Sequence, residues 1–441
     1  MSTKTSTYLS AFDRVEGERK HEPAWLRATR RSAAGAFERM GFPTVRDEEW
    51  RFTNVGPIAE TAFAPAPAVA VPPADAARFV VPGLAGPVMV FVDGRYAREL
   101  STVDAPGAGV TTITLADAIE RDPAGLEPHL GRHTNFTDRP FAALNTALFD
   151  DGALITVADG TIVEQAIQVL FLSTVTPTPA VSNPRVLVVL GRNSQARLVE
   201  TYAGIGFARG FTNAVTEIVV GAGSVLDHYR LQRESESAFH IGHTQFQLGR
   251  SSSSSSHAIS FGGLIARHDA VAVLGDEGVT CTLNGLYLAD GVRLIDNHTE
   301  IDHAMPHGTS RQIYKGILAG RARGVFNGRI RVRPDAQKTD AKQTNKTLLL
   351  SDEAQVNTKP QLEIFANDVK CTHGATVGQL SEDALFYLRT RGIGLDDARS
   401  LLVRAFATDV TSRMGLEPVR AELDRLLAAK LPGTLAEKAF V

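Results

Sequence analysis

The sequence predicts a mainly β protein in which short strands stack as a solenoid, with helical segments before and after them. From about residue 140 to 378, apolar runs with period-2 alternation dominate, and no helix-length periodicity interrupts them. Small polar turns recur at close to multiples of about fifteen residues, at Gly191, Gly221, Gly275, Asp290, Gly320, Asp335 and Asp352. A β-sandwich would give similar strands, but usually with Asn-Gly or Asp-Gly hairpins and fewer repeats, so a β-helix is favoured.

The segment before the solenoid divides into two parts. Residues 1–61 are expected to form an N-terminal helical region, with a helix over residues 23–43 that ends at Pro43. The apolar residues of that helix share one face: Leu26, Ala33, Phe37 and Met40. Residues 62–139 are rich in Pro and Ala, which indicates an extended connector and the entry to the solenoid, whose core spans 140–378.

Residues 379–441 predict three consecutive helices. The first begins at Ser381, an N-cap residue followed by two acidic residues, and ends near Gly392. The second lies within 396–414, and the third begins at 417 with Pro418 in its first turn. An apolar stripe follows the second helix: Leu401, Leu402, Phe406 and Val410. These helices either cap the end of the solenoid or form a docking surface.

Composition limits the classes of function. The chain has 441 residues, 43% of them hydrophobic, and a net charge of −3, which does not favour a nucleic-acid-binding surface. Two cysteines are too few for a disulfide framework and fit a reducing compartment. The first twenty residues lack a signal-peptide pattern, and no apolar stretch is long enough to span a membrane. We therefore expect a soluble, cytoplasmic protein.

Several motifs favour structural roles. His298, His303 and His307 have acidic neighbours, but they lie in a strand-and-turn segment where His298 and His303 would face opposite sides. They are expected to be hydrogen-bonded structural histidines. Residues 204–210 imitate a dinucleotide-binding loop with the wrong spacing and predict a turn. No Walker A sequence occurs, and the six serines at 251–256 predict a mobile loop or solenoid edge.

Cys371 and His373 are the strongest functional candidates from the residues alone. On a strand, positions i and i+2 project from the same face, so thiol and imidazole lie side by side. A buried cysteine beside a hydrogen-bonded histidine remains an alternative, and mutual activation as a hydrolase pair would be awkward in this geometry. A zinc or iron–sulfur site normally takes four ligands, which this chain cannot supply in one place. A metal here would need ligands from another subunit, which points to an interface site.

Beyond these patterns, a long block resembles a known family. Residues 320–380, together with 46–54, 143–152, 260–270, 283–288 and 296–307, resemble the SufB/SufD family of the SUF iron–sulfur cluster assembly machinery. The Cys-Thr-His-Gly-Ala-Thr segment and the presence of only two cysteines resemble the SufD branch.

The resemblance implies a right-handed parallel β-helix and a non-catalytic scaffold subunit. It implies a heterodimer with a SufB paralogue through the β-helix, and docking of the ATPase SufC on the C-terminal helices, where the apolar stripe lies. The nascent cluster would form at the SufB–SufD interface, with His373 and the neighbouring Cys371 as this chain's contribution. The cluster would be transient, and the lone chain would bind no cofactor stably. His373 would either ligate iron or assist sulfur transfer.

A β-helix carbohydrate-active enzyme is the alternative. Its candidate groups are Asp296, Asp302 and Arg293. Such enzymes need a cleft lined with acidic and aromatic groups. The chain has only two Trp and seven Tyr, and its polar strand residues are not visibly clustered.

Overall fold

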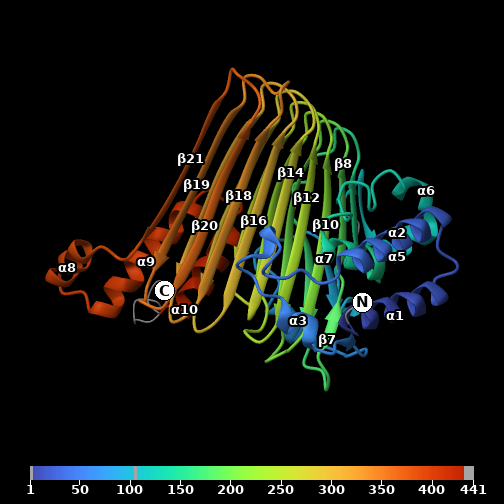
Figure 1. Cartoon of the computed structure of the whole chain (residues 1–441), viewed down its shortest axis with the longest axis horizontal. Helices are drawn as coiled ribbons and strands as arrows, with labels where there is room; N and C mark the ends of the chain where they lie inside the picture. Colours follow the sequence, from blue (N-terminus) through green and yellow to red (C-terminus); the bar gives the residue numbers. More distant parts are fainter. Residues whose placement is uncertain (1–2, 104–106, 432–441) are drawn as a thin grey trace.

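The computed structural model describes residues 3–103 and 107–431, and its centre is a flattened parallel β-solenoid built from two sheets (Figure 1). Sheet A comprises β4 (Val110–Thr114), β5 (Gly152–Val157), β8 (Arg185–Leu190), β10 (Phe211–Val220), β12 (Phe239–Leu248), β14 (Ile265–Leu274), β16 (Leu294–His303), β18 (Arg323–Val332) and β20 (Gln355–Ile364), with β1 (Ala64–Pro65) and β7 (Ala180–Ser182) beside it. Sheet B comprises β3 (Arg95–Tyr96), β2 (Val88–Val92), β6 (Ile167–Ser173), β9 (Gln195–Gly204), β11 (Val225–Arg233), β13 (Ser253–Ser260), β15 (Thr280–Ala289), β17 (Thr309–Leu318), β19 (Asp340–Leu349) and β21 (Lys370–Gly378).

Each coil of the solenoid contributes one strand to each sheet. Thr309, for example, pairs with Thr280 on one side and with Asp340 on the other, so a coil takes about thirty residues and a strand with its turn about fifteen. In the described part of the chain, β5 to β21 make about eight coils. The prediction of a β-helix is confirmed, and the fifteen-residue spacing is the length of half a coil.

Alternation along each strand separates an inward from an outward face. On β19 the inward residues Ala341, Gln343, Asn345 and Thr347 are all buried, whereas Lys342 and Lys346 between them are exposed. The same alternation in the preceding coils fills the interior with aliphatic and aromatic side chains and with a smaller number of polar ones. A residue's face is therefore fixed by its pairing register.

The N-terminal region packs on the outer face of sheet A. It contains α1 (Thr3–Glu18), α2 (Ala24–Met40), η1 (Glu48–Trp50) and α3 (Gly56–Glu60). The predicted helix over residues 23–43 is confirmed as α2, and its residues Leu26, Ala33 and Phe37 are buried. Helix α1 lies within the region expected to be helical, although the sequence patterns did not single out a helix over Thr3–Glu18.

The connector and the solenoid entry are more ordered than the composition indicated. Besides β1 to β4, they contain α4 (Pro73–Ala77), η2 (Arg98–Leu100), α5 (Leu115–Arg121) and α6 (Pro123–Leu126). Strand β2 already pairs in parallel with β6, and α7 (Pro140–Leu148) precedes the first coil strand, β5. The solenoid therefore recruits strands from before residue 140, and its coils begin at Gly152.

The six-serine run was predicted as a mobile loop or solenoid edge, and the mobile-loop reading is wrong. Residues 253–256 open the regular strand β13, which pairs with β11 and β15. Ser254 and Ser256 are buried in the interior, and the Ser256 hydroxyl lies 2.9 Å from Nδ1 of His228. Each inward hydroxyl therefore packs or finds a hydrogen-bonding partner inside the coil.

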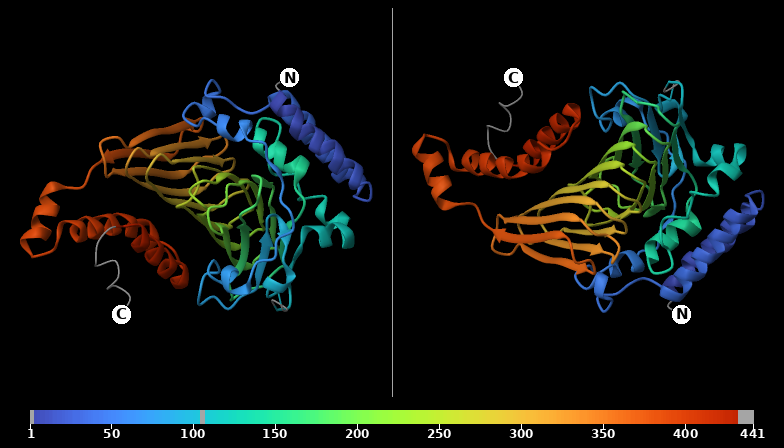
Figure 2. Two further views of the ribbon diagram at one scale, coloured as in Figure 1. Left: turned by 90° about the horizontal axis from the view of Figure 1, so that it is seen from below. Right: turned by 90° about the horizontal axis from the view of Figure 1, so that it is seen from above.

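The C-terminal helices are α8 (Glu382–Thr390), α9 (Leu395–Thr411) and α10 (Glu417–Lys430), which confirms three predicted helices. The Ser381 hydroxyl accepts from the backbone N–H of Ala384, the N-cap contact that the sequence predicted. Helices α9 and α10 lie along the solenoid, while α8 projects from its end (Figure 2). Among residues 3–103 and 107–431, no helix is both long enough and apolar enough to cross a membrane.

Candidate functional site

Cys371 and His373 lie on β21, the last strand of sheet B. The register pairs Cys371 with Ala341 and His373 with Gln343, both of which are buried in the solenoid interior. Thr372 pairs with the exposed Lys342 and so belongs to the outward face. The prediction that Cys371 and His373 share one strand face is confirmed, and the register shows that this is the inward face, whereas Thr372 faces outward.

The last coil leaves this inward face uncovered. Gln343 on β19 is 2% exposed, whereas His373, one coil further on, is exposed, and Val377 on the same face is 47% exposed. Strand β21 lies at the end of the solenoid and pairs with β19 on one side (Figure 1). The interior of the solenoid is therefore open at β20 and β21.

Cys371 is only half-buried, at the corner of this open coil. It contacts an apolar cluster that includes Ile330, Val332 and Ala366. Burial against these groups raises the pKa of the Cys371 thiol above its ordinary value. Because the thiolate is the form that binds metals, the thiol is a weak ligand on the lone chain at neutral pH.

The second cysteine cannot complete the site. Cys281 faces inward in the same column as Cys371, separated from it by Ser310 and Ala341 on the two intervening strands. Three strand spacings place the two cysteines about 14 Å apart. Burial raises the pKa of Cys281 to about 12. One nitrogen and one sulfur ligand are thus all that the open coil offers to a soft metal.

A polar ladder runs beneath His373, and the sequence patterns did not single it out. Gln343 donates from Nε2 to Oε1 of Gln312 at 2.7 Å, and Gln312 donates from its Nε2 to the Thr299 hydroxyl at 2.5 Å. Both glutamines are buried. The signal in the sequence was the alternation Ala341, Gln343, Asn345 and Thr347, in which every second residue faces inward.

The three histidines of the 298–307 segment have separate environments. His298 faces outward, with Nδ1 3.2 Å from Glu49 and Nε2 3.1 Å from Asp296. His303 faces inward, and its Nε2 lies 2.9 Å from the Ser310 hydroxyl, while His307 is exposed in a turn. The predicted opposite facing of His298 and His303 is confirmed. Within the residues that the structure describes, no three His, Cys, Asp or Glu side chains gather as metal ligands.

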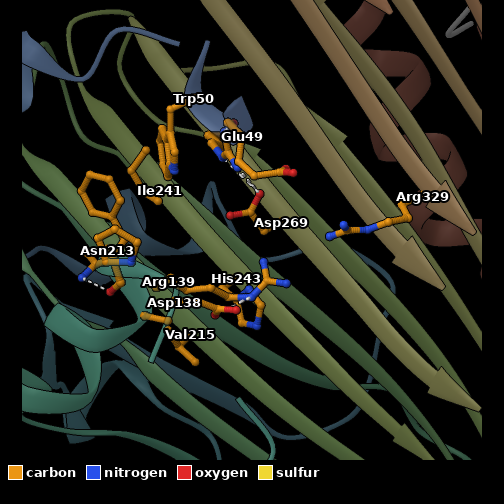
Figure 3. A pocket seen from close by; sticks show the side chains of 15 residues that line it. Glu49, Trp50, Asp138, Arg139, Asn213, Val215, Ile241, His243, Asp269 and Arg329 are labelled. Carbon is orange, nitrogen blue, oxygen red and sulfur yellow. Dashed lines mark hydrogen bonds and ion pairs between the residues drawn. The ribbon is translucent and has the colours of Figure 1, made fainter. Parts of the chain in front are cut away.

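A cavity of about 110 Å³ lies between the N-terminal segment and the outer face of sheet A (Figure 3). Its charged side chains are paired: Arg267 contacts Asp269 at 2.9 Å, and Arg139 and Arg329 contact Glu300 at 3.3 and 3.1 Å. Burial lowers the pKa of His243 in its wall to about 3, so that ring is neutral. The cavity is a joint between the N-terminal segment and the solenoid, with no excess of either charge.

The side chains suggested as catalytic groups of a carbohydrate-active enzyme already form ion pairs and hydrogen bonds within the chain. Asp296 accepts from Thr53 at 2.6 Å and pairs with Arg267 at 3.1 Å. Asp302 pairs with Arg333 at 2.6 Å, and Arg293 donates to Asp290. These contacts hold the solenoid and its N-terminal segment together, and the structure gives no pair of free carboxyl groups facing a cleft among them.

The apolar stripe of the second C-terminal helix is divided between two environments. Val410 is fully buried against sheet B, in a cluster with Val403, Ala407 and Ile317. Phe406 packs on the edge of that cluster beneath Lys315, and Leu401 and Leu402 are half-buried. The most exposed apolar residues of these helices lie on α8, where Phe386 is 71% and Tyr387 58% exposed.

Comparisons with known proteins cover nearly the whole chain. Residues 172–406 match the family model described as "SUF system FeS cluster assembly, SufBD core domain", and residues 2–169 match "SufBD protein N-terminal region". The chain is 33% identical to the SufBD family protein slr0076 of Synechocystis over 91% of this chain and 90% of that protein. It is 31% identical to iron–sulfur cluster assembly protein SufD of Escherichia coli, over 90% of both chains.

A further relative is Protein ABCI7, chloroplastic, of Arabidopsis thaliana, which is 38% identical over 54% of this chain and 51% of that protein. The family matches agree with the solenoid, because the core-domain model spans most of its coils. The chain therefore belongs to the SufBD family of SUF iron–sulfur cluster assembly proteins.

Proposed function

We propose that this chain is the SufD-type scaffold subunit of a cytoplasmic iron–sulfur cluster assembly complex, non-catalytic itself, and that the open coil is where it pairs with a SufB-like paralogue. The observation that carries the proposal is the uncovered inward face of β21, where His373 and Cys371 lie at the end of an otherwise filled interior. A second solenoid placed against this end would cover the coil and bring in the missing ligands.

In this arrangement the cluster is cargo, assembled at the interface and then passed on. His373 supplies one imidazole nitrogen, which either ligates iron or assists a persulfide in transit. Cys371 has a secondary role, because its thiol is held protonated by burial, and the principal thiolate comes from the partner.

We further propose that the C-terminal helices dock a SufC-like ATPase. The exposed Phe386 and Tyr387 of α8 and the half-buried Leu401, Leu402 and Phe406 of α9 offer apolar surface, and Val410 supports it from beneath. Helix α8 projects beyond the end of the solenoid, which leaves it within reach of a separate protein (Figure 2).

The test is a comparison of His373→Ala with Thr372→Ala in cells that depend on this complex alone for cluster assembly. His373→Ala is expected to keep the complex intact in pull-downs and to abolish cluster maturation, because the imidazole acts only in the covered site. Thr372→Ala is the matched control on the opposite face of the same strand and should support normal growth. Normal growth with His373→Ala would refute the assignment of this site.

The lone chain gives a second test. Purified without air, it should carry no stoichiometric iron or sulfide, because one nitrogen and one half-buried thiol cannot hold a cluster. Co-expression with the paralogue should yield a visible-absorbing species. A stable cluster on the lone chain would contradict an interface site.

A further inference from the structure

We propose that Gln343 is a positioning residue for His373: when the exposed His373 side chain turns toward the interior, the side-chain carbonyl of Gln343 accepts its imidazole N–H and so fixes which ring nitrogen is left with a lone pair. The inference deepens the function proposed above and rests on it for its biological meaning. Its physical content concerns only side chains of this chain.

The first observation is an unsatisfied acceptor. Gln343 is 2% exposed, and its Oε1 is buried without a hydrogen-bonding partner in the structure, where the exposed His373 imidazole does not contact it. Buried polar atoms are normally paired, so an orphaned one needs an explanation. The side chain points into the interior directly below the open coil, where a donor from the next strand would complete it.

The second observation is the direction of the ladder. Gln343 uses its amide nitrogen to donate to Gln312, and Gln312 donates in the same sense to Thr299. With the nitrogen committed to the coil below, the carbonyl oxygen is the atom left for the coil above. The residue at that register position on β21 is His373. A neutral imidazole has one N–H to give, and it is the matching donor.

The third observation is that Gly328 leaves room for the side-chain amide of Gln343. Gly328 on β18 faces Gln343 across the interior, and a Cβ on that residue would lie 2.9 Å from Cδ of Gln343 and closer still to its nitrogen. Any other residue at 328 would displace the amide. One coil further on, Pro360 takes the position of Gly328 and has no side-chain hydrogen-bonding group to compete for His373.

The consequence is a preset tautomer. Once one ring nitrogen donates to Gln343, the other keeps its lone pair and points away from the ladder, toward the uncovered side of the coil. Second-shell hydrogen bonds of this kind orient histidine ligands and raise their basicity. Gln343 therefore prepares His373 to meet an electrophile from the partner's side without touching that electrophile itself.

The test is nitrogen NMR on the full chain labelled at its histidines, with the His373 signals assigned by their loss in His373→Gln. Above the imidazole pKa, His373 of the parent should favour one tautomer more than the exposed His21 does in the same spectrum. Gln343→Leu should change the His373 tautomer ratio by roughly two- to tenfold, the effect of one hydrogen bond. An unchanged ratio in a folded Gln343→Leu chain overturns the inference.

A second variant, Gln343→Glu, keeps the inference testable if Gln343→Leu does not fold. Gln343→Glu keeps an acceptor at the same place and should raise the measured pKa of His373 by about 1 or more. Its matched control is Thr344→Glu, which places the same charge on the outward face one residue away. Equal shifts in the two variants would show that Gln343 does not face His373 and would also overturn the inference.

The cellular readout separates this inference from the proposed function. Gln343→Leu should lower cluster maturation severalfold, and Gln343→Leu combined with His373→Ala should be no worse than His373→Ala alone. If His373→Ala matures clusters normally, the proposed function fails, while the tautomer measurement still decides the role of Gln343.

Discussion

His298 lies between two carboxylates, Asp296 on its own strand and Glu49 in the distant N-terminal segment. Burial and Arg267 oppose a positive charge on the ring, but the two carboxylates outweigh them and raise the pKa of His298 above its ordinary value. The hydrogen bond from His298 in turn lowers the pKa of Glu49 to about 2. The three groups fasten the N-terminal segment to β16.

The contacts of His298 with Glu49 and Asp296 should make the free energy of unfolding depend on pH. Because the folded pKa of His298 is raised, its contribution is fully present below the unfolded value of about 6.5 and is lost as pH rises through the folded pKa. His298→Gln should lower the free energy of unfolding by about 1–3 kcal/mol at pH 6 and by less at pH 9. Denaturant titrations of both proteins across this range measure the difference, and parallel pH profiles would contradict it.

For single residues, the sequence predicted the strand face of a side chain better than it predicted that side chain's contacts. Strand alternation alone placed Cys371 and His373 on one face, and His298 and His303 on opposite faces. It could not find Glu49 as the partner of His298, because that contact joins residues 249 positions apart. The Gln343 ladder was missed because Gln343 and Gln312 come from successive coils that only the register aligns, and Thr299 lies on the opposite sheet of the same coil as Gln312.

Helix α9 joins the C-terminal region to the solenoid. The Lys315 ammonium group pairs with Asp409 at 2.9 Å and donates to the Phe406 carbonyl at 2.8 Å, while Val410 fills the apolar interface below. In the following turn, the Tyr229 hydroxyl accepts from the backbone N–H groups of Gly415 and Leu416. Sheet B is therefore covered on its outer face by α9 and α10. The predicted alternative in which these helices cap the end of the solenoid is not what they do, because that end stays open at β20 and β21.

We expect Val410→Asp to destabilise the chain by about 3–5 kcal/mol, because it places an unpaired carboxylate in an apolar interface. Leu401→Asp on the same helix is the matched control, and it should cost about 1 kcal/mol or less since that residue is half-buried. Thermal unfolding followed by circular dichroism compares the two. Similar losses would mean that α9 does not pack as described.

Docking of the ATPase should depend on a different surface of the same region. Phe386→Ser combined with Tyr387→Ser removes exposed apolar area from α8 and should leave the melting temperature of the chain within about 2 °C of the parent. The pair of substitutions should weaken capture of a SufC-like ATPase at least tenfold in a titrated pull-down. Undiminished capture would place the dock elsewhere on the chain.

Helices and strands were predictable where a periodic pattern continued over many residues and where the residues that specify the element lie within or beside it. The N-cap of α8, the first-turn Pro418 of α10 and the half-coil spacing all lie within a few residues of the structure they specify. The serine run misled because serine is common in loops, whereas here pairing on both sides and inward hydroxyl contacts make it a strand. Neither the strand pairing nor the hydroxyl contacts can be predicted from the six serines alone.

At the scale of the whole molecule, the solenoid is closed at one end and open at the other. At the first coil, Met89 and Phe91 of β2 fill the interior and Tyr96 of β3 packs against them, while β20 and β21 have half-exposed or exposed inward residues. An exposed strand edge with unpaired backbone groups favours addition of another chain. This asymmetry supports the proposal that a partner binds at the open coil.

Partner binding should therefore protect the last coil selectively. In hydrogen exchange followed by mass spectrometry, peptides spanning 355–378 of the lone chain should exchange at least tenfold faster than those of β12 to β17. Adding a SufB-like partner should slow exchange of the 355–378 peptides and leave the inner coils unchanged. Protection that appears only in the N-terminal region would contradict pairing through the open end.

The cover that α9 and α10 form over sheet B also sets an order of events during synthesis. Tyr229 lies beneath Gly415, 186 positions later in the chain. At about 5–20 residues per second, a ribosome needs roughly 10 to 40 s to pass from one to the other. Through that interval the coils already made can pair with one another, yet the apolar outer face of sheet B has nothing to cover it. The nascent chain is thus most exposed to chaperones, and to aggregation, just before its last helices emerge.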